Sequence, residues 1–309
     1  MAPVALDPVD LAGIERTAAD LAVAAGERLL SRFRTALAVE YKDRVGENPV
    51  TEADRDAERF LWQAIAARYP GHGVLGEEGT EPAPGTPYVW VIDPLDGTTN
   101  FINGLPLWCV SIGVLWYGRP VAGAIFTPSG PAAGHALFRA RLGGGAFLND
   151  TPVRVTPEPE PTRKRLASLP AHYWQDMRFL TRKPNRLGET RTLGSMALEL
   201  ALVAAGTLQY GVFWGPKIWD VAGGAVIVRE AGGLVLCRAG RGQPWSELHA
   251  FEPAQGPKSE PRSLRHWKGS LIAGSPPATR VLAADLRGRM KLPDGVKNAA
   301  GRIARRAPP

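Results

Sequence analysis

Hydrophobic residues recur along the chain with two different periods, and the two periods together predict a mixed α/β fold. Residues 8–34 carry apolar side chains at helical spacing with polar residues between them, which predicts an amphipathic helix. A second helix is predicted after Thr51, a favourable N-cap residue that two acidic residues follow, and it ends near residue 70. Between the two helices, residues 35–48 mix charges with glycine, and we expect a mobile loop or a hairpin there.

Short apolar runs bounded by glycine and proline predict a sheet in the first half of the chain. They lie at residues 74–75, 88–92, 108–117, 121–127, 136–140 and 146–148. From residue 108 onward their close spacing predicts a meander of mainly antiparallel strands.

A second half follows a break in composition at residues 156–161, which are rich in Pro and Glu. Helices are predicted at residues 195–205 and 219–230, and strands at 166–169, 211–213, 234–237 and 269–273. We therefore expect an α/β chain with an N-terminal half over residues 1–155, a C-terminal half over 156–285 and a basic, disordered tail over 286–309. Residues 239–266, which are rich in Gly, Pro and charge, are expected to loop out.

Composition and charge exclude several classes of protein. The hydrophobic content of 44% and the charged content of 22% are ordinary for a globular protein. The net charge of +7 comes mostly from residue 280 onward, a segment that contains eight Lys or Arg and two Asp. The rest of the chain is nearly neutral, so specific nucleic-acid binding is not expected. Cys109 and Cys237 lie in apolar runs and are typical of reduced core residues. No signal peptide or run of about 20 apolar residues is present, so we expect a cytoplasmic protein without a membrane partner.

The most informative stretch is PYVWVIDPLDGTTNF, in which a buried strand ends in two aspartates. The strand delivers Asp93 and Asp96 at its carboxyl end, and the proline between them leaves the Leu95 carbonyl free as a third oxygen ligand. The N–H groups of Gly97 and Thr98 then lie at the start of a turn or short helix, where a phosphate can bind. Hard oxygen donors beside an anion pocket indicate Mg²⁺ holding a phosphoryl group.

Each acidic motif also has a simpler interpretation. DPLDG alone is typical of a turn, Glu77 could lie in a solvated acidic turn, and Asp220 could be a helix N-cap. Four carboxylates at the ends of predicted elements, from three distant parts of the chain, are nevertheless more than a fold buries unpaired. Divalent cations would remove the repulsion, so the joint pattern favours a metal site.

Three motifs closely resemble the signatures of the inositol monophosphatase family of Mg²⁺-dependent, lithium-sensitive phosphatases. They are GEEG at 76–79, WVIDPLDGTTNF at 90–101 and WDVAGG at 219–224, and NPVTEAD at 48–54 and RTLGSMALELALVAAG at 191–206 support them. The resemblance runs in order from the first helix to about residue 285. It implies the layered αβαβα sugar-phosphatase fold, hydrolysis of a small-metabolite phosphate monoester, and a homodimer.

The resemblance also implies roles for individual residues around two or three Mg²⁺ ions. One ion would be held by Glu77, Asp93 and the Leu95 carbonyl, and a second would be shared by Asp93, Asp96 and Asp220. Water on the first ion would be the nucleophile, oriented by Glu77 and the Thr98 hydroxyl, with Asp54 supporting Thr98. The implied substrate contacts are Leu95, Asp96, Gly97, Thr98, Arg191, Gly194, Ser195, Phe213 and Asp220.

One departure from the family pattern bears on the substrate. Members that prefer inositol phosphates carry a glutamate seven residues before the third-signature aspartate, where this chain has Phe213 followed by Trp214. An aromatic ring cannot accept hydrogen bonds from sugar hydroxyls, which puts inositol itself in doubt. Basic residues could instead meet a second anionic group, although Arg191 could equally be structural; they are Lys42, Arg44, Arg191 and Lys217.

Several functions therefore stay open at this point. Within the family, the substrate could be histidinol phosphate, fructose bisphosphate or a nucleotide 3'-phosphate. A catalytically silent member that only binds phosphate-bearing ligands is an alternative of a different class, as is nucleic-acid binding through the basic tail.

Overall fold

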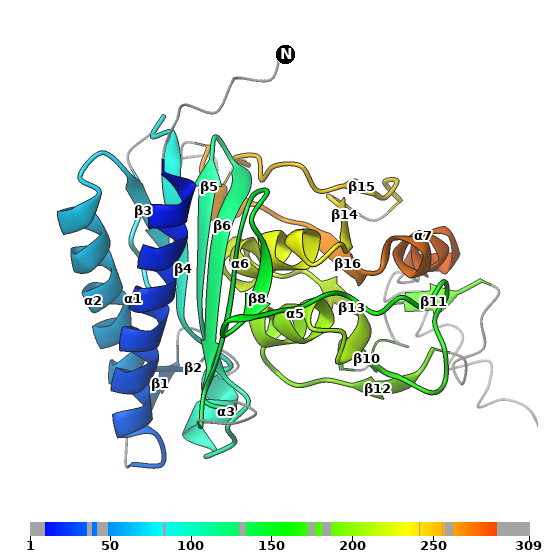
Figure 1. Ribbon diagram of the computed structural model, residues 1–309, viewed down its shortest axis with the longest axis horizontal. Helices are drawn as coiled ribbons and strands as arrows, with labels where there is room; N and C mark the ends of the chain where they lie inside the picture. The colour runs from blue at the N-terminus through cyan, green and yellow to red at the C-terminus, as the bar shows by residue number, and fades with distance from the viewer. Residues whose placement is uncertain are drawn as a thin grey trace, which may run out of the picture.

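The computed structural model stacks helices and sheets in alternating layers (Figure 1). It describes residues 10–35, 39–41, 49–82, 85–129, 134–171, 173, 177–180, 187–240, 242–254, 256 and 262–288. The α-helices are α1 (Leu11–Arg32), α2 (Glu52–Arg68), α3 (Thr98–Ile102), α5 (Met196–Ala204), α6 (Ile218–Glu230) and α7 (Pro276–Asp285), and η2 (Leu264–His266) is a 3-10 helix. Among these described residues, no helix combines the length and apolarity that a membrane span requires.

A seven-stranded sheet forms the first β layer. Its strand order is β3-β4-β5-β6-β7-β8-β9, in which β3 and β4 are parallel and the remaining pairs are antiparallel. The strands are β3 (Gly73–Gly76), β4 (Tyr88–Asp96), β5 (Cys109–Trp116), β6 (Arg119–Thr127), β7 (Ala136–Arg141), β8 (Gly145–Leu148) and β9 (Thr151–Pro152). The predicted antiparallel meander is confirmed.

A six-stranded mixed sheet forms the second β layer, with the order β12-β10-β13-β16-β14-β15. Its strands are β10 (Leu166–Ser168), β12 (Glu189–Arg191), β13 (Leu208–Trp214), β14 (Leu234–Arg238), β15 (Ser246–Glu247) and β16 (Ser270–Gly274). Two short antiparallel pairs complete the strands: β1 (Val39–Tyr41) with β2 (Pro49–Thr51), and β11 (Met177–Phe179) with β17 (Leu286–Gly288). The first pair agrees with the hairpin, one of the two alternatives expected for residues 35–48. Lys42 and Arg44 lie outside the described residues.

The layers follow the order αβαβα, as the resemblance implies. In Figure 1, α1 and α2 cover one face of the seven-stranded sheet, α5 and α6 lie between the two sheets, and α7 lies beyond the second sheet. The α1 helix begins at an Asp10 cap that accepts a hydrogen bond from the Gly13 N–H at 2.9 Å, and it buries Ile14 and Leu29 against the sheet. The apolar faces that the helical spacing predicts are therefore the faces that pack.

The expectation that residues 239–266 loop out is wrong for its central part. The β15 strand pairs with β14, and Leu248 and Phe251 are buried at 3% and 1% exposure. The Phe251 N–H also donates to the Gly118 carbonyl at 2.8 Å. Two apolar side chains in a polar segment are thus enough to tie it to the body of the protein. The division into halves at residue 155 and the tail over 286–309 stay predictions, although the described start of that tail, Leu286–Gly288, forms β17.

Candidate active site

The carboxyl end of β4 presents the two aspartates of the central motif. The register between β4 and β5 shifts between Asp93 and Asp96, an irregularity that re-aims side chains at the end of a strand. Asp93 is almost completely buried, at 1% exposure, and its Oδ1 accepts a hydrogen bond from the Leu95 N–H at 3.0 Å. The strand therefore ends inside the protein with the Asp93 carboxylate, whose only hydrogen-bond donor among the described residues is the Leu95 N–H of the same turn.

The following turn needs glycine at position 97. Gly97 has a φ of +94° and caps α3, and a Cβ there would lie 3.0 Å from the Leu107 carbonyl oxygen and 3.2 Å from the Ser195 Cβ. The first N–H groups of α3 follow directly, so the backbone at Gly97 and Thr98 forms the predicted start of a short helix.

The Thr98 hydroxyl is held between two acceptors. Its Oγ1 lies 3.1 Å from Asp54 Oδ1 and 3.0 Å from the Leu95 carbonyl oxygen. The other carboxylate oxygen of Asp54 accepts hydrogen bonds from the Thr51 N–H at 2.9 Å and the Thr51 hydroxyl at 2.5 Å. Burial raises the pKa of Asp54, while the bonds from Thr51 and Thr98 oppose the rise. The predicted contact between Asp54 and Thr98 is present.

Asp96 joins the end of β4 to the start of α5. Its Oδ2 accepts hydrogen bonds from the Ser195 hydroxyl and the Ala197 N–H, both at 2.7 Å. Burial raises the pKa of Asp96 to about 7, against these two hydrogen bonds. The substrate residue predicted at Ser195 therefore lies directly beside a predicted metal ligand.

Asp220 belongs to α6, which lies on the face of the seven-stranded sheet opposite to α1 and α2 (Figure 1). A Cβ at Gly113 of β5 would lie 2.6 Å from the Gly223 nitrogen, and a Cβ at Gly123 of β6 would lie 2.6 Å from the Gly223 oxygen. These glycines let the first turns of α6 lie directly on the sheet, which brings Asp220 toward the end of β4. The Asp220 Oδ2 accepts a hydrogen bond from the Lys217 N–H at 2.7 Å.

The turn that carries Glu77 is held by a buried residue that sequence reasoning missed. Glu58 of α2, exposed by 5%, accepts hydrogen bonds from the Glu78 N–H at 2.6 Å, the Thr80 N–H at 3.1 Å and the Thr80 hydroxyl at 2.8 Å. A Cβ at Gly76 would lie 2.4 Å from the Glu58 carboxyl carbon, so glycine is required for this approach. The local sequence does not distinguish Glu58 from the solvated acidic residues of the same helix.

The carboxylates act on one another electrostatically. Burial is the largest cause that raises the pKa of Asp93, and repulsion from Glu77, Asp96 and Asp220 follows it. The pKa of Asp220 is raised in the same way, by burial first and then by Asp96. Among the described residues, no three His, Cys, Asp or Glu side chains already stand in a ligand arrangement. These oxygen donors repel one another, and Asp93 is buried while Asp96 and Asp220 are half-buried. They nevertheless have the chemistry that a hard divalent cation requires.

A cavity of about 250 Å³ opens beside these carboxylates and contains most of the predicted substrate residues. Its walls include Asp96, Gly194, Ser195, Phe213 and Asp220. Glu199 also lines it and was missed by sequence reasoning, although its carboxylate accepts a hydrogen bond from the Leu193 N–H at 2.6 Å and so supports the Gly194 turn.

Like Leu95, Gly97 and Thr98, the predicted substrate residue Arg191 is not among the residues that line this cavity. Its side chain is exposed, and Nη1 donates to the neighbouring Thr190 carbonyl at 2.9 Å. Both interpretations of Arg191, as a substrate contact and as a structural residue, stay predictions.

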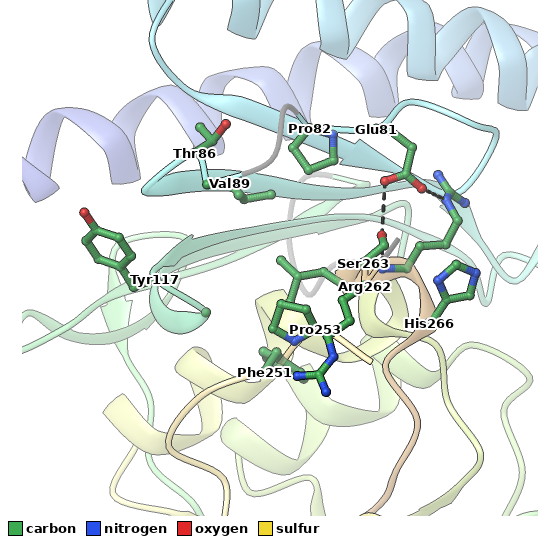
Figure 2. Close-up of a pocket in the computed structure, with 14 residues that line it drawn as sticks. Glu81, Pro82, Thr86, Val89, Tyr117, Phe251, Pro253, Arg262, Ser263 and His266 are labelled. Carbon is green, nitrogen blue, oxygen red and sulfur yellow. Dashed lines mark hydrogen bonds and ion pairs between the residues drawn. The ribbon is translucent and has the colours of Figure 1, made fainter. Parts of the chain in front are cut away.

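A larger cavity, of about 700 Å³, lies elsewhere and has no predicted metal ligand among its lining residues. Figure 2 shows its apolar walls, which include Val89, Tyr117 and Phe251, with Glu81 and His266 at one side. The size of a cavity therefore does not identify the candidate active site, whereas the position of the carboxylates identifies it as the smaller cavity.

Comparison with known proteins agrees with this geometry. A family model described as the inositol monophosphatase family matches residues 10–286. Inositol monophosphatase 3 of Solanum lycopersicum is 38% identical over 243 residues, which cover 72% of this chain and 85% of that protein. Enzymes of this family depend on a metal ion, generally Mg²⁺.

Solved structures give the same result. An IMPase of Thermotoga maritima superposes with a TM-score of 0.68 at 27% identity, covering 87% of this chain and 94% of that one. The extragenic suppressor protein suhB from Bartonella henselae superposes with a TM-score of 0.66 at 28% identity, covering 88% and 97%. The chain therefore belongs to the inositol monophosphatase family and is a phosphomonoesterase of that type.

Proposed function

We propose that this phosphomonoesterase works with Mg²⁺ held by Glu77, Asp93, Asp96, Asp220 and the Leu95 carbonyl, with two or three ions in the site. The supporting observation is the group of aspartates from β4 and α6 whose pKa values are raised by burial first and then by repulsion from neighbouring carboxylates. Bound Mg²⁺ would neutralise this repulsion and supply Lewis-acid stabilisation of the phosphoryl oxygens together with a lowered pKa for the attacking water.

The chain's own groups would position the ester and the water. The N–H groups of Gly97 and Thr98 lie at the start of α3 and would hold phosphate oxygens. The Thr98 hydroxyl can donate its single proton to Asp54 or the Leu95 carbonyl, which leaves its lone pairs free to orient a water molecule. Glu77 would complete this arrangement from the neighbouring turn.

The substrate would be a small phosphorylated metabolite with a flat ring or a second anionic group. Phe213 is 1% exposed and forms an apolar wall of the cavity that contains Asp96 and Asp220. A polyol such as inositol would place hydroxyls against that wall without partners, at a cost of about 1–3 kcal/mol for each unpaired group. Histidinol phosphate, fructose bisphosphate and a nucleotide 3'-phosphate are the test compounds that follow from this.

The experiment is phosphate release from these three compounds and from inositol monophosphates at fixed Mg²⁺. We expect turnover that a chelator abolishes, and turnover that Asp93→Asn and Asp220→Asn abolish without unfolding the protein. Metal-dependent binding without phosphate release from any compound would instead favour the silent ligand-binding alternative. Preference for inositol monophosphate would refute the role given to Phe213.

Assembly and location complete the proposal. We expect a homodimer, which sedimentation velocity would test, and a cytoplasmic protein, which fractionation would test. Neither expectation affects the residues assigned above.

A further inference from the structure

Arg265, in the 3-10 helix η2, makes contacts with the turn that carries Glu77. Its Nη2 donates to the Gly76 carbonyl at 2.6 Å and to the Thr80 carbonyl at 3.0 Å, and its Nη1 lies 3.4 Å from the Glu77 carbonyl oxygen. One guanidinium therefore reaches three carbonyls of a five-residue turn. The planar fork of arginine suits this task, whereas the single ammonium of lysine cannot reproduce it.

The same guanidinium is fixed by two further groups. Its Nε forms an ion pair with Glu81, and its central carbon lies over the ring of Trp219, 5.2 Å from the ring centroid. Trp219 immediately precedes Asp220, so Arg265 connects the Glu77 turn to the start of α6. Ser263 adds to the arrangement: its hydroxyl accepts from the Arg265 N–H at 3.0 Å and donates to Glu81 at 3.3 Å (Figure 2).

The turn is thus held from both sides by groups of opposite kind. The Glu58 carboxylate accepts from its N–H groups, and the Arg265 guanidinium donates to its carbonyls. With donors and acceptors both satisfied, the peptide planes on either side of Glu77 have little freedom to rotate.

We propose that Arg265 is a positioning residue that fixes Glu77 relative to Asp220 so that both can bind the metal. This inference rests on the proposed function, because it requires Glu77 and Asp220 to be metal ligands. Groups that orient metal ligands from behind contribute about 10- to 100-fold to metal affinity or activity. Arg265 has no contact with the cavity beside the carboxylates in the described part of the chain, so it acts through Glu77 and not on the substrate.

The test is Mg²⁺ binding measured by isothermal titration calorimetry with MgCl₂ alone, followed by the Mg²⁺ dependence of phosphate release. The variants are Arg265→Ala, Arg265→Lys and the matched control Arg262→Ala, which removes an exposed arginine three residues away. We expect both Arg265 variants to raise the Mg²⁺ dissociation constant about 10-fold or more. At saturating Mg²⁺, kcat should return to within a few-fold of the wild-type value, and Arg262→Ala should bind Mg²⁺ like the wild type.

Two comparisons keep the inference falsifiable. If Arg265→Ala does not fold, as judged by circular dichroism, Arg265→Lys decides, because it retains the positive charge beside Glu81. Mg²⁺ binding by Arg265→Lys within twofold of the Arg262→Ala value would overturn the inference. Glu77→Gln separates this result from failure of the proposed function: loss of Mg²⁺ binding in Glu77→Gln with normal binding in the Arg265 variants overturns the inference alone. Normal Mg²⁺ binding in Glu77→Gln overturns both.

Discussion

The contact between β5 and α6 offers a sharp test of how Asp220 reaches the site. Gly113 of β5 lies so close to α6 that a Cβ there would be 2.6 Å from the Gly223 nitrogen and 2.7 Å from the Ala222 carbonyl carbon. Both atoms belong to the helix backbone and cannot rotate away as a side-chain end could. Gly113→Ala should therefore push the helix away from the sheet.

The size of the effect follows from these distances. Ordinary contact begins at 3.4 Å, so a Cβ at 2.6 Å requires a displacement of about 0.8 Å. Overpacking of this kind costs about 1–3 kcal/mol of unfolding free energy. Asp220 lies in the first turn of the same helix and moves with it, and a misplacement of about 1 Å can lower a catalytic rate about 10²-fold.

Two measurements on each variant separate stability from placement. Urea unfolding gives the free-energy loss, and phosphate release at saturating Mg²⁺ below the unfolding transition gives the activity. Gly71→Ala is the matched control, because a Cβ there meets no atom within 4 Å, and we expect its stability within about 0.5 kcal/mol of the wild type. Wild-type activity in a destabilised Gly113→Ala protein would refute the reasoning that this contact places Asp220.

Three further predictions concern other parts of the site. Thr98→Val removes the hydroxyl beside Asp54 while keeping the side-chain shape, so kcat should fall about 10²-fold or more, and an unchanged kcat would exclude a role in orienting water. Glu58→Gln keeps only one of the two acceptor oxygens that bind the Glu78 and Thr80 groups, and it should lower the unfolding free energy in urea by about 1–3 kcal/mol; no loss would contradict the contact. Because burial raises the pKa of Asp96 from 3.8 to about 7, the unfolded chain ionises first as pH rises, and stability falls over that range. The melting temperature of chelator-treated protein should therefore be lower at pH 8 than at pH 5, and saturating Mg²⁺ should reduce the difference; equal melting temperatures without Mg²⁺ would argue against burial of these acids.

Most of the fold could be predicted from local patterns because the segments are regular. The period of apolar residues predicts α1 over residues 8–34, and the structure has it over Leu11–Arg32. The four runs predicted between residues 108 and 148 correspond to β5, β6, β7 and β8, whereas the short β9 was not predicted. The 239–266 segment could not be predicted in the same way, because its composition is polar and the burial of Phe251 depends on a distant partner at Gly118. The period of apolar residues indicates which face of a helix or strand is buried, but it gives no information on an isolated buried residue such as Phe251.

The parts of the candidate site that lie in consecutive motifs could be predicted from the sequence. The residues that only support the turn carrying Glu77 could not. Asp93, Asp96 and Asp220 interact electrostatically as the motifs indicate. Glu58 and Arg265 stabilise the same turn from residues 18 or more positions away, and no local pattern distinguishes such a Glu or Arg from a solvated one. Their roles depend on tertiary contacts alone.

The third signature shows how one motif serves packing and chemistry together. In WDVAGG, the aspartate supplies the carboxylate, and Gly223 three residues later supplies the bare backbone on which the sheet rests. A side chain at Gly223 would lie 2.9 Å from the Ile112 carbonyl oxygen, so the helix could not approach the sheet and carry Asp220 to the end of β4. The same short motif therefore has to contain both residues, because the distance between helix and sheet decides how close Asp220 comes to the carboxylates at the end of β4.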